Sequence, residues 1–260
     1  SGGASGTILE AGLQALPIGA HVFPIQGDVR IAFMVYEQET GQEYRFVPEG
    51  PVVTEAELQP VLDFLETHPA RYIVASGSLP RGLGADTYAR MARIARRTGA
   101  RFVLDASGAA LSAALAEGRI FLFKPSLSEL EKLAGHSLDI DTARLFAGDL
   151  IARGAVENVA LTLGGDGAML ISAAGAVRMP AISVPVRSAV GAGDSFVGGM
   201  VWALSHGQTI AEAFRFGLAA GAAAVMTPGT ELCRRADILR LYAEACAAQH
   251  EERAARWVST

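Results

Sequence analysis

The chain has few cysteines, no long apolar run and no excess of positive charge. Only two cysteines, Cys233 and Cys246, occur among its 260 residues, and their spacing matches neither a metal nor a redox motif. A disulfide scaffold is therefore excluded, and a reducing cytoplasm is the expected compartment. The formal net charge of −5 argues against a nucleic-acid partner, which would require a basic surface.

The sequence also lacks long apolar runs and histidine pairs spaced to bind a metal. No apolar run reaches the roughly 18 residues that a membrane-spanning helix requires, and charged residues are dispersed, so we expect no membrane partner. The 5 histidines are scattered and form no ligand pair. We therefore assign no histidine a role.

What the chain does have is enough apolar sequence for a large core. Hydrophobic residues make up 50% of it and charged residues 19%, which excludes disorder across the whole chain. From about residue 70 onwards, short apolar runs alternate with stretches of helical periodicity. Continuous apolar strands separated by helices predict an α/β fold with a mostly parallel sheet covered by helices on both faces. The strand-like runs are YIVASGSL (72–79), RFVLDASG (101–108) and RIFLFKPS (119–126).

Two segments depart from this alternation. The sequence GGDG (164–167) between NVALTL and AMLIS predicts a hairpin turn. Residues 22–48 contain two alternating runs around Glu39-Thr40-Gly41-Gln42 and predict a β-hairpin whose apolar positions need a partner surface. We therefore expect a single α/β domain over residues 1–260 with a small β-lid at 22–48. The last seventy residues, rich in alanine and glycine, predict closely packed helices.

The segment SAVGAGDSFVGGMVWAL (188–204) carries the strongest chemical signal. Gly191, Ala192 and Gly193 precede an apolar helix, whose first N–H groups could meet an anion. Asp194 follows at the helix start, where the helix dipole favours its ionised form, so it could act as a base beside a bound phosphate. An ordinary N-cap aspartate after a glycine turn is the alternative from spacing alone.

The string GAGDSFVGG resembles the signature of PfkB-type sugar kinases of the ribokinase superfamily. Three further segments resemble the same family in the same order: SGSLPRG (76–82), KPSLSELEKL (124–133) and TLGGDGAML (162–170). Within the family, YRFVPEGP and SGSLPRG are most similar to the minor-type 6-phosphofructokinases, with the 1-phosphofructokinases and tagatose-6-phosphate kinases nearby. The resemblance implies a ribokinase-like fold with a β-lid.

The resemblance implies a catalytic role for the signature. Asp194 would deprotonate the acceptor hydroxyl, and the N–H groups of Gly191, Ala192 and Gly193 would stabilise charge on the transferring phosphoryl group. Both roles suit phosphoryl transfer, in which positioning and electrostatics provide most of the catalysis.

The resemblance also implies how ATP and Mg²⁺ are held. Lys124 would lie near the ATP phosphates, and Glu129 would hold Mg²⁺ through water, as Mg²⁺ keeps much of its hydration shell. Ser126 stands where the family has asparagine, which shortens the reach of that side chain. Without the resemblance, Lys124 is a strand-end lysine and Glu129 a first-turn carboxylate.

Residues toward the carboxyl end of the chain would border the nucleotide and a monovalent cation. Ser188 and the Val190 carbonyl match positions near a monovalent-cation site in relatives, although many relatives carry an aspartate where this chain has the stretch 186–188. A plain hairpin turn is the alternative for the residues at 162–167. The nucleotide residues implied are Thr162, Gly164, Gly167, Thr227 and Gly229.

The acceptor site is less well marked. Arg30, expected on the first hairpin strand, matches an arginine that grips the sugar phosphate, and Arg45 is a weaker candidate for the same role. Ser78 would hydrogen-bond the sugar. An exposed strand arginine is the alternative for Arg30, and Asp105, at a strand end, is expected to cap a turn.

Together these residues predict an ATP-dependent kinase that converts fructose 6-phosphate to fructose 1,6-bisphosphate, with Mg²⁺ as a cofactor and K⁺ as a candidate. The acceptor could instead be the substrate of a 1-phosphofructokinase or of a tagatose-6-phosphate kinase. A different class of function is also open, in which the protein senses a sugar or nucleotide without catalysis. We expect a homodimer joined through the β-lid. We also expect that the family's amino-terminal segment, with part of the acceptor floor, is absent from this chain.

Overall fold

A six-stranded sheet forms the centre of the computed structural model, which describes residues 1–40 and 42–258, with side chains for all of these except 43 and 248–258. The strands lie in chain order, and the first four run parallel to one another. The fifth strand pairs antiparallel with the fourth, and the sixth pairs antiparallel with the fifth. The prediction of a mostly parallel sheet is confirmed. The strands are β3 (Tyr72–Ser76), β4 (Arg101–Asp105), β5 (Ile120–Phe123), β6 (Val156–Thr162), β7 (Ala168–Ser172) and β8 (Gly175–Met179).

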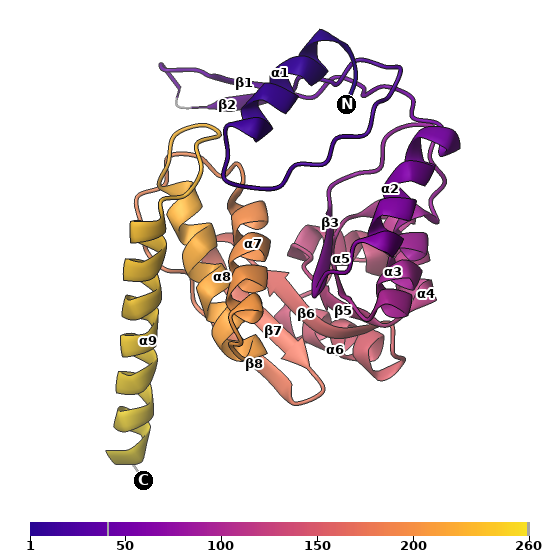
Figure 1. Cartoon of the computed structure of the whole chain (residues 1–260). Coiled ribbons are helices and arrows are strands. Elements are labelled where there is room, and N and C mark those ends of the chain that lie inside the picture. Colours follow the sequence, from indigo (N-terminus) through magenta and orange to yellow (C-terminus); the bar gives the residue numbers. More distant parts are fainter. Residues whose placement is uncertain (41, 259–260) are drawn as a thin grey trace.

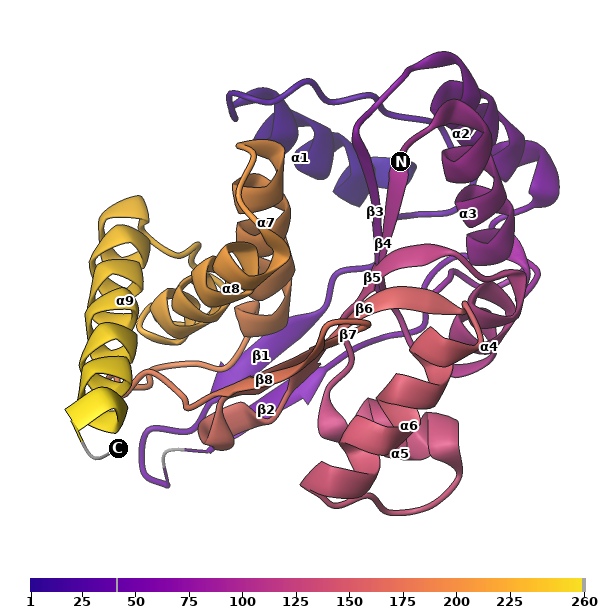
Figure 2. The same cartoon turned by 90° about the horizontal axis from the view of Figure 1, so that it is seen from below.

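Helices cover both faces of this sheet, as the continuous apolar strands required (Figures 1 and 2). One face packs against α3 (Thr87–Thr98), α4 (Gly108–Glu117), α5 (Leu127–Ala134) and α6 (Ile140–Ala152). The other packs against α7 (Ala192–Ser205) and α8 (Ile210–Val225), and α9 (Arg235–Val258) lies against α8.

Neighbouring residues of the central strands supply the two halves of the core. Leu104 and Phe123 belong to the cluster under α3–α6, whereas Val103 and Leu122 belong to the cluster under α7 and α8. All four side chains are fully buried. This alternation follows from the pleat of a strand, which sends successive side chains to opposite faces.

The predicted hairpin is present but shorter than expected. Strands β1 (Phe33–Tyr36) and β2 (Glu43–Phe46) pair antiparallel as a separate two-stranded sheet (Figure 1). The rings of Phe33 and Phe46 stack with their centroids 5.1 Å apart. The turn residue Gly41 lies outside the described residues. Phe33 is 53% exposed and Phe46 is 48% exposed, so the apolar side chains of the hairpin remain uncovered within this chain.

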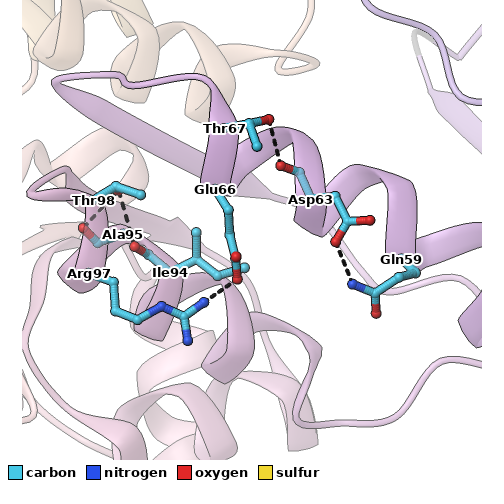
Figure 3. Close-up of polar contacts among 8 residues, drawn as sticks. All are labelled: Gln59, Asp63, Glu66, Thr67, Ile94, Ala95, Arg97 and Thr98. Carbon is cyan, nitrogen blue, oxygen red and sulfur yellow. Dashed lines mark hydrogen bonds and ion pairs between the residues drawn. The ribbon is translucent and has the colours of Figure 1, made fainter.

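Two helices were not predicted from the sequence, α1 (Gly3–Gln14) and α2 (Glu55–Thr67). Helix α2 begins with a capping box between Thr54 and Glu57 and packs against α3. Figure 3 shows the ion pair between Glu66 of α2 and Arg97 of α3. No helix among residues 1–40 and 42–258 is both long and apolar enough to cross a membrane.

The predicted close packing of the alanine- and glycine-rich helices is confirmed where α7 meets α8. A Cβ atom at Gly217 of α8 would lie 2.5 Å from Met200 Cγ and 2.8 Å from the Phe196 carbonyl oxygen of α7. A Cβ atom at Gly199 would lie 2.7 Å from Ala220 Cβ. Glycine at these positions allows the two backbones to approach, which fixes where α7 begins over the sheet.

Gly217→Ala should therefore destabilise the fold. Because the new methyl group meets backbone as well as a side chain, we expect the free energy of unfolding to fall by about 1–3 kcal/mol in urea denaturation. Gly198→Ala is the matched control: a Cβ atom there meets nothing within 4 Å, so the higher helix propensity of alanine should raise the free energy of unfolding by about 0.5–1 kcal/mol. Equal stability of the two variants would contradict this account of the helix contact.

Candidate active site

The candidate site lies at the carboxyl ends of the parallel strands. Ser76 ends β3 and Asp105 ends β4, and the two are register partners in the sheet. Lys124 follows β5 directly, and its N–H donates to the Leu104 carbonyl at 3.1 Å. In open α/β sheets this edge is where ligands bind, so the strand order alone brings these polar side chains to a functional position.

An ion pair joins the ends of β4 and β5. Lys124 Nζ lies 3.1 Å from Asp105 Oδ1, and the two side chains are only 7% and 13% exposed. Burial raises the pKa of Asp105 above its ordinary value; Lys124 acts in the opposite direction, and the negative charges of Glu129 and Asp194 add to the rise. The expectation that Asp105 caps a turn is wrong, because its carboxylate instead holds the Lys124 ammonium.

The glycine signature forms the amino-terminal end of α7. Gly191 is the N-cap residue with φ +74°, a left-handed conformation that favours glycine. A Cβ atom at Gly193 would lie 3.4 Å from Lys124 Nζ, so the lysine ammonium sits beside the first turn of the helix. An anion bound here would meet a cation, the positive end of a helix dipole and N–H groups without partners inside the helix.

Asp194 stands in the first turn of α7, and its side chain is exposed to solvent. The Ser76 hydroxyl donates to Asp194 Oδ1 at 3.4 Å, which links the end of β3 to the helix. The alternative of an N-cap aspartate is wrong, because Gly191 occupies the N-cap position. The Asp194 carboxylate is therefore open to accept a proton beside the anion position.

Ser126 and Glu129 form a capping box at the start of α5. The Ser126 N–H donates to Glu129 Oε2 at 2.7 Å, and the Glu129 N–H donates to Ser126 Oγ at 3.3 Å. One Glu129 oxygen thus stabilises the helix start. The negative charge of Glu129 also raises the pKa of Asp105.

The predicted turn after β6 is confirmed. The Thr162 N–H donates to the Pro125 carbonyl at 2.9 Å, which ties this strand end to the chain after Lys124. Residues 164–166 form a short 3-10 turn, and Gly164 has φ +60°. Gly167 has φ +93°, and a Cβ atom there would lie 2.1 Å from the Met179 carbonyl oxygen. Glycine at 167 is therefore a steric requirement of the turn.

The segment around Ser188 is tied to the carboxyl end of α8. The Ser188 N–H donates to the Val225 carbonyl at 3.3 Å, and its buried hydroxyl accepts from the Val190 N–H at 3.3 Å. The buried Thr227 hydroxyl lies 2.8 Å from the carbonyls of Ala224 and Glu231. That hydroxyl is thus used to fasten the chain after α8, near Gly229 with φ +57°.

Within the described part of the chain, none of the acceptor candidates Arg30, Arg45 and Ser78 forms a hydrogen bond or ion pair with Asp194. Arg30 precedes β1 instead of lying on a hairpin strand, so that expectation is wrong, and Arg45 lies on β2 opposite Met34. Both arginines make no ion pair within the described part of the chain. Ser78 is exposed two residues after β3. It is Ser76, not Ser78, that contacts Asp194.

Ser76 is a site residue that sequence reasoning missed, and Asp105 is one to which it gave only a turn-capping role. Both are polar residues that end an apolar strand run, and the carboxyl ends of parallel strands share one edge of a sheet. The position of both residues at strand ends could be read from the sequence. The sequence could not show that Ser76 contacts Asp194 or that Asp105 pairs with Lys124.

The carboxylates of the site suit a metal ion that a bound phosphate ligand also coordinates. Among the described residues, no group of three or more histidine, cysteine, aspartate or glutamate side chains could enclose a metal ion. Mg²⁺ commonly takes one or two carboxylates, with waters and phosphate oxygens completing its coordination. A single carboxylate, such as that of Glu129, together with waters and phosphate oxygens would fit that pattern.

Comparisons with known proteins identify the family of this chain. The family model described as pfkB family carbohydrate kinase matches residues 2–237. The chain is 40% identical over 245 residues to ATP-dependent 6-phosphofructokinase isozyme 2 of Mycobacterium tuberculosis (strain H37Rv), which covers 93% of this chain and 72% of that protein. It is 36% identical over 193 residues to 1-phosphofructokinase of Rhodobacter capsulatus, covering 74% of this chain and 60% of that protein.

Solved structures give the same result for the fold. Phosphofructokinase-2 from Escherichia coli in complex with potassium superposes with a TM-score of 0.90 at 33% identity, over 95% of this chain and 80% of that one. Ribokinase from Arabidopsis thaliana, complexed with ribose and ATP, superposes with a TM-score of 0.64 at 21% identity, over 81% of this chain and 68% of that one. This second likeness concerns the fold alone.

The buried ion pair at the centre of the site can be tested by a double-mutant cycle. Asp105→Asn leaves the Lys124 ammonium buried without a carboxylate, so the free energy of unfolding should fall by about 3 kcal/mol or more. Adding Lys124→Met to that variant removes the unpaired charge and should restore most of the loss. The four proteins are compared by urea denaturation at neutral pH. A coupling free energy below about 0.5 kcal/mol between the two positions would contradict the pairing.

Proposed function

The chain belongs to the pfkB family of carbohydrate kinases and is an ATP-dependent phosphosugar kinase; we propose that its acceptor is fructose 6-phosphate, converted to fructose 1,6-bisphosphate. The observation that supports this activity is the meeting of Asp194, Lys124 and the first turn of α7. A base, a cation and a set of helix N–H groups then surround one anion position. A sensor without catalysis would not need the exposed carboxylate.

In the proposed reaction, Asp194 acts as the general base. Its carboxylate takes the proton of the acceptor hydroxyl as that oxygen forms a bond to the γ-phosphorus of ATP, and the bond to the β,γ-bridging oxygen breaks to release ADP. The hydrogen bond from Ser76 at 3.4 Å orients the carboxylate. Because Asp194 is exposed, it can pass the proton to solvent afterwards.

The chain's positive groups stabilise the transferring phosphoryl group. The N–H groups of Gly191, Ala192 and Gly193 and the Lys124 ammonium would meet its equatorial oxygens. Asp105 holds the lysine at 3.1 Å, so the ammonium is positioned before substrate arrives. Such pre-positioning is favourable because no reorganisation is required during the reaction.

Mg²⁺ and K⁺ are further parts of the proposal. Mg²⁺, when bound, would neutralise charge on the ATP phosphates, and Glu129 would hold it through water with its second carboxylate oxygen. Ser188 and the Val190 carbonyl would border a monovalent cation. The support is that this loop is fixed to the end of α8, and that a similar E. coli enzyme has been solved in complex with potassium.

The remaining site residues are proposed to hold the nucleotide and the acceptor. Arg30, Arg45 and Ser78 would bind the phosphosugar, with the guanidinium groups on its phosphate. Support for fructose 6-phosphate over a 1-phosphate comes from the higher identity to the 6-phosphofructokinases of M. tuberculosis. The proposed nucleotide contacts are Ser126, Thr162, Gly164, Gly167, Thr227 and Gly229.

A panel of acceptors tests the substrate directly. ADP release is measured with fructose 6-phosphate, fructose 1-phosphate, tagatose 6-phosphate and unphosphorylated fructose. We expect the highest kcat/KM with fructose 6-phosphate. Preference for fructose 1-phosphate would replace the proposed acceptor with that of a 1-phosphofructokinase, and no ADP release with any sugar would favour a sensor.

Asp194→Asn should separate binding from chemistry. The amide keeps the size of the side chain but cannot accept the proton, so kcat should fall by about 10² or more while nucleotide affinity is largely retained. Stopped-flow or coupled assays give kcat, and calorimetry gives the nucleotide affinity. Asp141→Asn, at an exposed position on α6, is the control and should leave both unchanged. Near-normal turnover of the first variant would remove Asp194 from the role of base.

Arg30→Ala should raise the KM for the phosphosugar far more than the KM for ATP. A hydrogen bond to a charged group contributes roughly 1.5–3 kcal/mol, so the sugar KM should rise about ten- to a hundredfold. The exposed Arg178 of β8 offers a control of equal charge, and Arg178→Ala should leave both constants unchanged. If the sugar KM of Arg30→Ala is normal, Arg45 becomes the next candidate for the phosphate.

The exposed hairpin is proposed to pair with a second copy of the chain. Ile31 is 60% exposed, Phe33 53% and Phe46 48%, and a stacked aromatic pair left in water is unfavourable. Light scattering at micromolar concentration should report a dimer. Phe33→Ser combined with Phe46→Ser should shift it toward the monomer, whereas a monomeric parent chain would contradict the proposal.

A further inference from the structure

A cleft lies at the edge of the sheet opposite the candidate active site, where the parallel strands begin. Its volume is about 580 Å³, and it is bordered by the last turn of α4, the first residues before β5 and the chain that leaves α6. Lining residues include Glu117, Gly118, Arg119, Arg153 and Gly154. A volume of this size is within the range of small-molecule sites.

The charges around this cleft are predominantly positive. Glu117 forms ion pairs with Arg93 at 2.7 Å and with Arg96 at 2.8 Å, so two arginines already balance its single carboxylate. Arg119 and Arg153 also line the cleft, and neither makes an ion pair within the part of the chain that the structure describes. Two arginines and one acid thus line the hollow, and that acid is already paired with Arg93 and Arg96, in a chain whose net charge is −5.

Arg119 has an unusual backbone conformation. Its φ of +58° makes it the one non-glycine residue with positive φ among residues 1–40 and 42–258. The Arg119 N–H donates to the Gly154 carbonyl at 2.9 Å, which holds this conformation against the end of α6. Glycine would adopt such a φ without strain, so an arginine here suggests that its side chain serves a purpose.

Arginines at the ends of α4 and α6 could simply oppose the helix dipoles, whose negative ends lie here. That explanation accounts for the position of Arg153 beside α6. It does not account for a strained arginine at 119, because a lysine or arginine inside the last helical turn would oppose the dipole without strain. Nor does it account for the hollow that the two arginines line.

We propose that this cleft binds a phosphorylated small molecule, with Arg119 and Arg153 as its phosphate ligands. A guanidinium group offers paired N–H donors that match phosphate oxygens, and two of them can bracket a diphosphate. The helix ends are unfavourable for an anion, so affinity depends on these two side chains. The five-residue step from Arg119 to Lys124 runs along β5 and spans about 16 Å, so a ligand here does not reach the kinase site.

Inorganic pyrophosphate is the probe for the test, used in isothermal titration calorimetry on the whole chain at low ionic strength. The kinase site is expected to bind pyrophosphate too, so the titration should show two binding events. The variants identify which of the two belongs to the cleft. Arg119→Asn removes the charge with a residue that tolerates positive φ, and Arg153→Gln removes it at an exposed position. Each should weaken one binding event about tenfold or more.

Arg144→Gln on α6 is the control for a general loss of charge, and it should bind pyrophosphate like the parent chain. The rate of ADP release without pyrophosphate should be unchanged in all three variants, so failure of the kinase proposal would not be mistaken for failure of this one. If Arg119→Asn does not fold, as judged by its unfolding midpoint, Arg153→Gln decides the matter alone. Isotherms of the folded variants that superimpose on those of the parent would overturn the proposal.

Discussion

The ion pair between Lys124 and Asp105 holds the candidate active site together. It joins the ends of two neighbouring parallel strands and places the ammonium group beside the first turn of α7. Two charges that are nearly buried are stable only when they are paired. The position of the Lys124 ammonium beside the first turn of α7 is therefore a property of the folded sheet.

The placement of α7 depends on a second constraint, the small residues that it shares with α8. Gly199 and Gly217 let the two helix backbones approach, and Phe196 and Met200 of α7 pack into the core above β4 and β5. The first turn of α7 consequently ends over the carboxyl edge of the sheet. Asp194 and the N–H groups of the first turn of α7 owe their location to this packing.

The two edges of the parallel sheet have opposite chemistry. The carboxyl edge combines one lysine with the carboxylates of Asp105, Glu129 and Asp194, which suits a substrate that brings its own phosphates and a metal ion. The amino edge around Arg119 and Arg153 is mostly positive and has helix carboxyl ends instead of helix amino ends. Chain direction explains this contrast, because every strand–helix unit points the same way in a parallel sheet.

The sequence by itself determined the strand and helix alternation, the turn at Gly164–Gly167 and the glycine signature before Asp194, because these depend on local periodicity and on conformations that glycine favours. It did not reveal α1 and α2, and it placed Arg30 on a strand that begins only at Phe33. Tertiary structure alone decided that Ser76 contacts Asp194 and that Asp105 pairs with Lys124. These contacts join residues far apart in the chain, and they arise from strand register and helix packing, which no local pattern encodes.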